Sequence, residues 1–154
     1  MEYQSSFHKK LLDNNFVFTS EITPPDASDQ ETLLTKIKPL KGVADAVNVT
    51  DSPGAKAHMS SLTAAIILAQ NDIEPILQLT VRDRNRLALQ GDLIGASALG
   101  VHNILCLSGD DPKIGDQPET TAVHWQAGDK KGVVHSLLTK PLMNLRQDAR
   151  EIFN

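Results

Sequence analysis

The sequence has few of the features that point to a secreted, metal-binding or membrane protein. It has a single cysteine, which excludes an intrachain disulfide, and its cysteine and five histidines form no cluster with the spacing of a zinc site. The longest apolar run, residues 64–69, is far too short to cross a bilayer. The first residues also lack the basic start and apolar core of a signal peptide. We therefore expect a soluble, cytoplasmic protein that has no bound metal and does not associate with a membrane.

The chain also lacks an excess of positive charge. Its 15 basic residues are outnumbered by 19 acidic ones, and they form no stripe with interleaved aromatic side chains. A protein that binds nucleic acid through the phosphate backbone needs such a basic surface. Nucleic acid is therefore excluded as an expected partner, and the 154 residues suffice for one ordinary globular domain.

Four segments rich in aliphatic and β-branched residues each end at polar residues, proline or glycine. Near-continuous apolar runs of this length are typical of strands buried in a parallel sheet. The predicted strands are Phe16–Ile22, Ala46–Thr50, Pro75–Val81 and Asn103–Leu107.

Helical patterns lie between these strands. The first helix is expected to begin at the capping box Ser28–Glu31 and to end at Gly42, and the second to cover about His58–Ala69. The third is expected to follow Asp83 as its N-cap and to end at Gly100. The positions expected to face the sheet are Leu33, Leu34, Ile37 and Leu40, then Leu62, Ala65, Ile66 and Ala69, then Leu89, Leu93 and Ala96. This alternation predicts an α/β fold of parallel βα repeats.

The alternation breaks near the C-terminus, where we predict a divergent tail. Residues 124–132 have the composition of a polar loop, and Val133–Phe153 has an amphipathic, helix-like pattern interrupted by Pro141. Since proline fits the first turn of a helix but not its interior, we place a last helix at about Pro141–Ile152. The predicted division is therefore residues 1–123 with four strands and a tail of residues 124–154.

Two carboxylates follow predicted strands and are the first candidates for chemistry. Asp110 comes after the last strand in Ser108-Gly109-Asp110, where glycine permits close approach of the backbone to a flat ligand. Glu21 ends the first strand and precedes two prolines that hold the backbone extended, which suits a general acid. A solvated carboxylate at a strand end explains Glu21 equally well. Active sites of parallel α/β proteins gather at the carboxyl ends of strands, so both residues are expected there.

Three further groups have weaker signals. Thr50 and Asp51 follow the second strand, where a local turn bond to the backbone is the favoured interpretation. Gln78 interrupts an apolar strand, so its amide must find partners, and it could point toward a ligand. Residues 82–86 contain three arginines, which could capture an anion, although a solvated helix cap balanced by Asp83 is favoured.

Taken together, these motifs resemble the methylenetetrahydrofolate reductase family in order and spacing. The resemblance covers about residues 16–123 and rests on residues 20–25 (SEITPP), 48–51 (NVTD), 79–86 (LTVRDRNR), 103–112 (NILCLSGDDP) and 115–116 (GD). It implies a (β/α)8 barrel that binds FAD and uses NAD(P)H to reduce 5,10-methylenetetrahydrofolate to 5-methyltetrahydrofolate, a reaction of one-carbon metabolism and methionine biosynthesis.

The resemblance also implies roles for individual residues. Glu21 matches the general acid that helps to open the methylene bridge, and Asp110 matches an acid close to both flavin and folate. The positions that match flavin contacts are Thr50, Gln78, Leu107, Ser108, Gly109 and Asp110. Gln78 stands where the family often has histidine.

The chain departs from the family in length. A complete barrel needs about 250 residues, whereas four βα units make roughly half of one, which would leave two strand edges and the inner face uncovered. The apolar residues of the tail, a second copy in a homo-oligomer, or another polypeptide that completes the barrel could cover them. A truncated or frame-shifted reading frame explains the unfamiliar C-terminus equally well.

Three functions are compatible with this pattern. The first is the flavin-dependent reductase, and the second is a non-catalytic half-barrel subunit or partner-binding module derived from the same family. The third is an unrelated four-unit α/β enzyme whose acidic residues bind a divalent metal.

Overall fold

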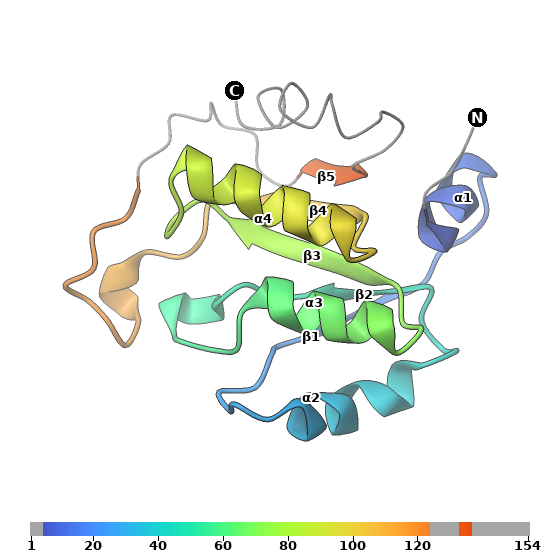
Figure 1. The fold of residues 1–154 in the computed structure, drawn as a ribbon, viewed down its shortest axis with the longest axis horizontal. Helices are drawn as coiled ribbons and strands as arrows, with labels where there is room; N and C mark the ends of the chain where they lie inside the picture. Colours follow the sequence, from blue (N-terminus) through green and yellow to red (C-terminus); the bar gives the residue numbers. More distant parts are fainter. Residues whose placement is uncertain (1–4, 124–132, 137–154) are drawn as a thin grey trace.

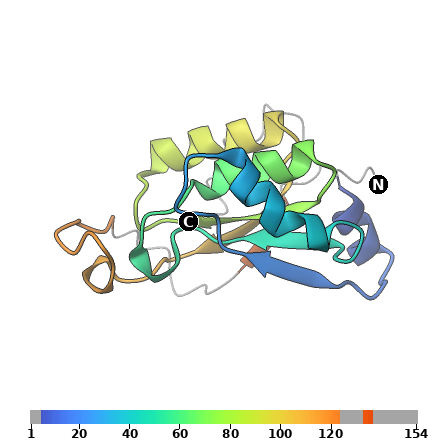
Figure 2. The same ribbon diagram turned by 90° about the horizontal axis from the view of Figure 1, so that it is seen from below.

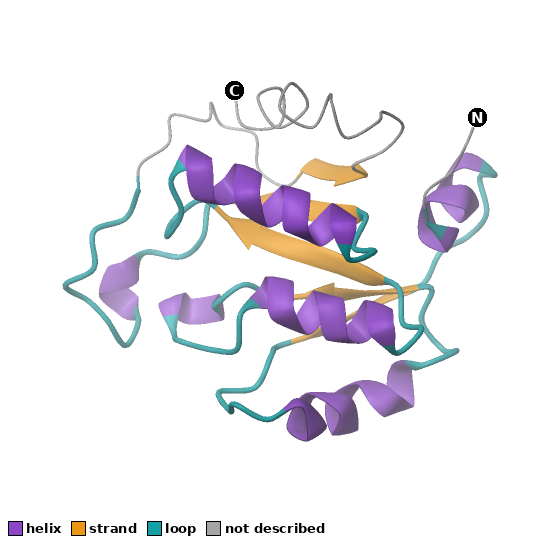
Figure 3. Ribbon diagram, viewed as in Figure 1, coloured by secondary structure: helices purple, strands orange, loops and turns teal. Residues whose placement is uncertain are grey.

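The computed structural model describes residues 5–123 and the backbone of residues 133–136. It is an α/β fold with five strands in the order β1-β2-β3-β4-β5, of which the first four are parallel (Figure 1). The strands are β1 Thr19–Ile22, β2 Ala46–Val49, β3 Pro75–Thr80, β4 Asn103–Leu107 and β5 Val133–Ser136. The helices are α1 Ser6–Leu12, α2 Gln30–Ile37, α3 Ser61–Gln70 and α4 Arg86–Ala98, with short 3₁₀ turns η1 Lys38–Leu40, η2 Pro53–Ala55 and η3 Pro112–Ile114 (Figure 3).

The four predicted strands are confirmed in place and direction. The prediction for β4 has the correct ends, while β2 and β3 each end one residue earlier than predicted and β1 begins three residues later, at Thr19. Residues 16–18 are not part of the strand because this segment leads from α1 into the sheet and leaves Phe16 almost fully exposed. Apolar character alone therefore predicted too long a first strand.

All three crossover helices lie on the same face of the sheet (Figure 2). Alternate strand residues point toward them and form the main core with residues such as Val49, Leu77, Leu79 and Ile104. Successive strands are also spatial neighbours, without the reversal of order that defines a doubly wound sheet. The arrangement is consistent with part of a TIM-type barrel.

Two helix starts differ from the predicted caps. The N-cap of α2 is Asp29 rather than Ser28, because the Asp29 carboxylate accepts hydrogen bonds from both the backbone N–H and the hydroxyl of Thr32. The N-cap of α4 is Asn85, whose side chain accepts from the N–H of Ala88. Asp83 is not available as a cap because its carboxylate binds Arg82.

Helix α3 begins at Ser61 rather than near His58. The preceding chain is held away from the helix because the N–H of Met59 donates to the carbonyl of Pro25. The predicted inward face is also partly wrong: Ala65 is buried as expected, but Leu62, Ile66 and Ala69 are only partly buried, whereas Ala64, Ile67 and Leu68 are buried. Because this helix is apolar almost all round, its sequence gave little information on which side faces the sheet.

The predictions for α2 and α4 were more successful, since the apolar residues of α2 lie on one face and those of α4 that face the sheet recur at helical spacing. Leu33 and Ile37 are buried, with Leu34 and Leu40 packed at the margin of the core, and Leu89, Leu93 and Ala96 are all buried. Gly42 and Gly100 follow these helices with φ of +77° and +84°.

Two elements were not predicted. Helix α1 lies at the N-terminal ends of the strands (Figure 1). It buries Phe7 against Ala46 and Ile76, whose side chains alternate with those that face the other helices. Strand β5 pairs antiparallel with β4 over residues where a helix-like pattern was expected. A prediction of helix at Val133–Ser136 is therefore wrong, while the predicted loop 124–132 and helix Pro141–Ile152 lie outside the described residues.

Strand β5 covers the outer edge of β4, one of the two edges expected to be exposed. Within the part of the chain that the structure describes, no helix is long and apolar enough to cross a membrane.

Candidate active site

The predicted site residues all lie toward the carboxyl ends of the strands, and the four parallel strands bring these ends to the same side of the sheet. This side is called the carboxyl edge below. Glu21 lies in β1, Thr50 follows β2 and Gln78 lies in β3. Leu107 is the last residue of β4, and residues 108–110 follow it directly. The edge faces the loop of residues 108–121 at the left of Figure 1.

Glu21 and Gln78 are in direct contact. The Nε2 atom of Gln78 donates to Oε2 of Glu21 at 2.9 Å, and the bond passes over β2, which lies between the two strands. Gln78 is buried, with 7% of its surface exposed, whereas Glu21 is exposed. The amide that needed a partner therefore finds it in the carboxylate proposed for proton transfer.

Thr50 is buried just beyond the end of β2. Its hydroxyl donates to the hydroxyl oxygen of Thr23 at 3.3 Å, and its backbone N–H donates to the carbonyl of Ile22. These contacts join the loops that follow β1 and β2.

Asp110 is exposed and makes a contact across β3 in the same way. Its Oδ2 atom accepts from the backbone N–H of Gly54, in the loop after β2, at 2.7 Å. This loop has left-handed backbone at Ser52, Gly54 and Ala55, with φ of +48°, +65° and +54°. The Asp110 carboxylate therefore ties the loop after β4 to an unusually shaped loop after β2.

The same two loops are joined at further points. Asp116 accepts from the N–H of Ala57 at 3.0 Å, and a Cβ built on Gly115 would lie 1.9 Å from the carbonyl oxygen of Ala55. Only glycine fits that approach. The loops after β2 and β4 therefore form one packed unit over the end of β3.

Arg82 lies beneath this unit. Its guanidinium binds Asp83 through Nε and Nη2, and Nη1 approaches the carbonyls of Ser52 at 3.4 Å and Asp110 at 3.5 Å. Hydrogen bonding to Asp83 raises the pKa of Arg82, which is buried. The interpretation of residues 82–86 as a solvated cap is therefore wrong for Arg82, although Asp83 does balance it.

Gly109 also meets a packing requirement that was not predicted. Its φ is +86°, and a Cβ there would lie 2.8 Å from Cβ of Arg82 and 3.2 Å from Cβ of Thr80. Glycine at this position is thus required by the packing of the protein against itself.

A network around Asp51 was missed by sequence reasoning. Oδ2 of Asp51 accepts from the backbone N–H of Thr80 at 2.8 Å, from the Thr80 hydroxyl at 3.0 Å and from Nη1 of Arg84 at 2.6 Å. Arg84 also binds Asp92 of α4 through Nε. Burial lowers the pKa of Arg84, but its bonds to Asp51 and Asp92 outweigh that effect and raise it. The predicted local turn bond of Asp51 is a long-range bond, and sequence carries no signal of its partner.

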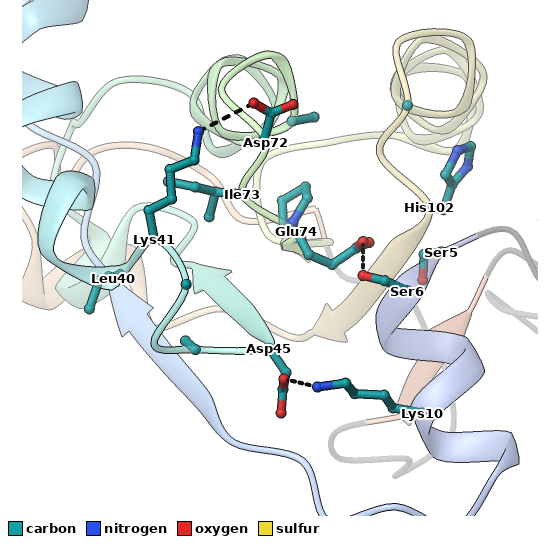
Figure 4. A pocket seen from close by; sticks show the side chains of 15 residues that line it. Ser5, Ser6, Lys10, Leu40, Lys41, Asp45, Asp72, Ile73, Glu74 and His102 are labelled. Carbon is teal, nitrogen blue, oxygen red and sulfur yellow. Dashed lines mark hydrogen bonds and ion pairs between the residues drawn. The ribbon is translucent and has the colours of Figure 1, made fainter.

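Two large cavities lie at opposite ends of the sheet. One, of about 640 Å³, is at the carboxyl edge and is lined by Arg82, residues 108–113 and residues 118–123. The other, of about 700 Å³, lies at the N-terminal ends beside α1 (Figure 4). Its charged groups find partners, since Lys41 pairs with Asp72, Lys10 pairs with Asp45, and Glu74 accepts from the hydroxyl of Ser6. The slightly smaller cavity is the better candidate because the predicted residues Ser108, Gly109 and Asp110 line it.

The fold and this edge define a class: an α/β protein of sequential parallel βα units that presents carboxylates and a cavity where such proteins bind ligands. The model of the methylenetetrahydrofolate reductase family matches residues 6–134, and the chain belongs to that family. The match begins earlier and ends later than the interval 16–123, since it includes α1 and reaches β5. A comparison with curated proteins gives no match. Membership of the family suggests an oxidoreductase.

Proposed function

We propose that the chain acts in a flavin-dependent methylenetetrahydrofolate reductase, which uses NAD(P)H and FAD to reduce 5,10-methylenetetrahydrofolate. The observation that carries the proposal is the shared carboxyl edge of Glu21 and Asp110 in a chain of this family. The Glu21 carboxylate is held by the side-chain amide of Gln78, and the Asp110 carboxylate is held by the backbone N–H of Gly54. The two carboxylates can therefore serve different steps of the reaction.

The residues present fit FAD in part. Ser108, Gly109 and Asp110 line a cavity whose volume of about 640 Å³ is within the usual range for small-molecule sites. Leu107 is half-buried beside them, and Lys113 from the same lining offers positive charge for a diphosphate. Thr50 and Gln78 do not line this cavity, and they bind Thr23 and Glu21 instead. They would contact the cofactor only where it extends beyond the cavity over the ends of β2 and β3.

FAD, when bound, would supply hydride transfer from NAD(P)H to the folate. Glu21 in its protonated form would donate its proton to the bridge nitrogen of the folate that leaves, so that the methylene carbon becomes an electrophilic iminium on the other nitrogen. Gln78 would hold Oε2 of Glu21 and leave Oε1 toward the substrate. Asp110 would place negative charge near the pterin and orient it.

The test has two stages. The purified protein is first mixed with FAD and examined by its absorbance spectrum. If flavin is neither retained nor taken up, the proposal fails for this chain. In protein that holds flavin, Glu21→Gln is expected to abolish folate reduction while it largely spares NAD(P)H oxidation by an artificial acceptor. Glu31→Gln, which changes an exposed glutamate on α2, is the matched control and is expected to change neither. Equal loss of both half-reactions in Glu21→Gln would contradict the role of Glu21.

One observation favours a second candidate, a non-catalytic module that binds a partner. A parallel barrel would continue beyond β4 with another parallel strand, but β5 pairs there in the antiparallel direction. This candidate predicts a protein that folds and takes up no flavin, and a folded protein with stoichiometric FAD would exclude it.

A further inference from the structure

Arg82 is a buried cation beneath the two loops that follow β2 and β4. Only 5% of its side chain is exposed, compared with 41% for its partner Asp83. Nε and Nη2 of the guanidinium donate to the two carboxylate oxygens of Asp83 at distances between 2.7 and 3.0 Å. Because the planar fork of an arginine matches a carboxylate in one orientation, this pair fixes the direction of the remaining nitrogen, Nη1.

Nη1 of Arg82 lies between the two loops and contacts both. It is 3.4 Å from the carbonyl oxygen of Ser52, in the loop after β2, and 3.5 Å from the carbonyl oxygen of Asp110, in the loop after β4. Both hydrogen bonds are long, so neither is strong by itself. Together they hold two separate loops to one rigid group.

Two further contacts join Arg82 to the loop after β4. A Cβ built on Gly109 would lie 2.8 Å from Cβ and 3.5 Å from Cδ of Arg82, so the backbone of Gly109 packs directly on this side chain. The N–H of Val123 donates to the carbonyl of Arg82 at 2.8 Å. Arg82 therefore contacts this loop near its start and again at residue 123.

The Asp110 carboxylate depends on how the two loops lie relative to each other. It accepts from the backbone N–H of Gly54, which belongs to the same loop as Ser52, at 2.7 Å. Asp110 is exposed, so burial does not restrain its side chain. Arg82 holds the backbone of Asp110 beside the loop after β2, and the carboxylate reaches Gly54 only while this arrangement is kept.

We propose that Arg82 is a positioning residue for Asp110, which keeps the Asp110 carboxylate on Gly54 at the rim of the cavity of about 640 Å³. The inference rests on the proposed function, in which Asp110 acts beside the flavin and the folate. Arg82 exerts its role through Asp110. Lysine is not equivalent, because a single nitrogen cannot bind Asp83 at two points and also reach two carbonyls.

Amide exchange at Gly54, measured by NMR, tests the arrangement without flavin. Asp110→Ala removes the acceptor and sets the fastest rate for this amide. We expect Arg82→Lys to raise the exchange rate about tenfold, toward the Asp110→Ala rate, because the hydrogen bond opens more often. The double variant Arg82→Lys/Asp110→Ala should exchange no faster than Asp110→Ala alone. An unchanged rate in Arg82→Lys would overturn the proposal.

Ile37→Val is the matched control for a general loss of stability. Ile37 is buried at the end of α2, from which the chain leads toward the start of β2, so it lies at the opposite end of the sheet from the two loops. This variant should leave the Gly54 amide at the wild-type rate, and an equal rise in both variants would contradict the proposal. If Arg82→Lys does not fold, Asp83→Asn replaces it, because it weakens the pair but keeps Arg82, and it should also accelerate exchange at Gly54.

In protein that holds flavin, folate reduction tests whether this position matters for the reaction. Asp110→Ala and Arg82→Lys should each lower kcat for folate reduction, and the double variant should be no slower than Asp110→Ala. If the two losses multiply in the double variant, Arg82 acts independently of Asp110 and the proposal is wrong. A wild-type chain that takes up no flavin would contradict the proposed function, whereas exchange at Gly54 would still decide whether Arg82 positions Asp110.

Discussion

The side-chain amide of Gln78 holds the carboxylate of Glu21 at 2.9 Å, although the two residues lie on strands that are not neighbours. The bond crosses the inner face of the sheet, opposite α2, α3 and α4, where β2 contributes Asn48 between them. A buried amide thus restrains an exposed acid, and this restraint is intrinsic to the chain.

The Glu21–Gln78 bond should be measurable as a coupling energy. In a double-mutant cycle with Glu21→Ala and Gln78→Ala, we expect the free energies of unfolding to differ from additivity by about 1 kcal/mol, the usual net contribution of a hydrogen bond. Urea unfolding of the four proteins gives this value. As a control, the cycle of Glu31→Ala with Gln78→Ala should be additive, because Glu31 lies on α2 at the other face. Additivity in the Glu21 cycle would mean that the contact is not formed in solution.

Much of the fold could be predicted because it depends on local pattern. The apolar run ending at Leu107 and the periodic leucines Leu89 and Leu93 specify a strand and a helix face without knowledge of anything distant. The helix starts were less certain because several side chains competed for each cap. Asp83 is as good a cap by itself as Asn85, and only the presence of Arg82 decides between them.

The sequence was sufficient to predict which end of the sheet carries the candidate site, but not the contacts that the site residues make. Parallel strands guarantee that Glu21, Gln78 and Asp110 share a rim, so topology alone was sufficient for that inference. The partners Gly54 of Asp110 and Thr80 of Asp51 are far away in sequence, and no periodicity indicates them. For the same reason, Gly109 could be recognised as special, but its close approach to Arg82 could not be predicted.

The ion pair of the buried Asp51 with the partly buried Arg84 is expected to be important for stability. Asp51→Asn removes the charge that faces Arg84 in a buried position, and we expect a loss of about 3 kcal/mol in the free energy of unfolding. Arg84→Met leaves the Asp51 carboxylate unpaired and should cost a similar amount. The double variant should lose less than the sum of the two, as chemical denaturation would show.

The exposed pair of Lys41 and Asp72 is a matched control for that experiment. The Asp72 side chain is almost fully exposed, so Asp72→Asn should leave the free energy of unfolding within error of wild type. If Asp51→Asn and Asp72→Asn behave alike, the network around Asp51 has no special role in stability.

Cys106 predicts a specific loss of stability at alkaline pH. Partial burial in β4 raises the pKa of its thiol from 9.0 to about 11, because desolvation disfavours the thiolate. The thiol of the unfolded chain ionises at a lower pH than the thiol of the folded protein. The stability that the protonated thiol contributes to the folded state is therefore fully present below pH 9 and is lost as the pH rises toward 11. Urea unfolding at pH 8 and pH 10.5 should show a smaller decrease for Cys106→Ala than for wild type. Equal decreases in the two proteins would mean that the thiol is not shielded from water in solution.

A comparison of alanine substitutions at Gly109 and Gly100 distinguishes the cost of backbone strain from the cost of steric conflict. Both have left-handed backbone, with φ of +86° and +84°, but a Cβ at Gly100 has nothing within 4 Å whereas a Cβ at Gly109 meets Arg82 at 2.8 Å. Gly100→Ala should therefore cost about 1 kcal/mol through its backbone alone. Gly109→Ala should cost a further 1–3 kcal/mol or so, because the loop after β4 must move away from Arg82. Thermal and urea unfolding give both differences, and limited proteolysis should show faster cleavage within residues 108–121 in Gly109→Ala only. Equal effects of the two substitutions would show that the loop does not pack on Arg82 as described.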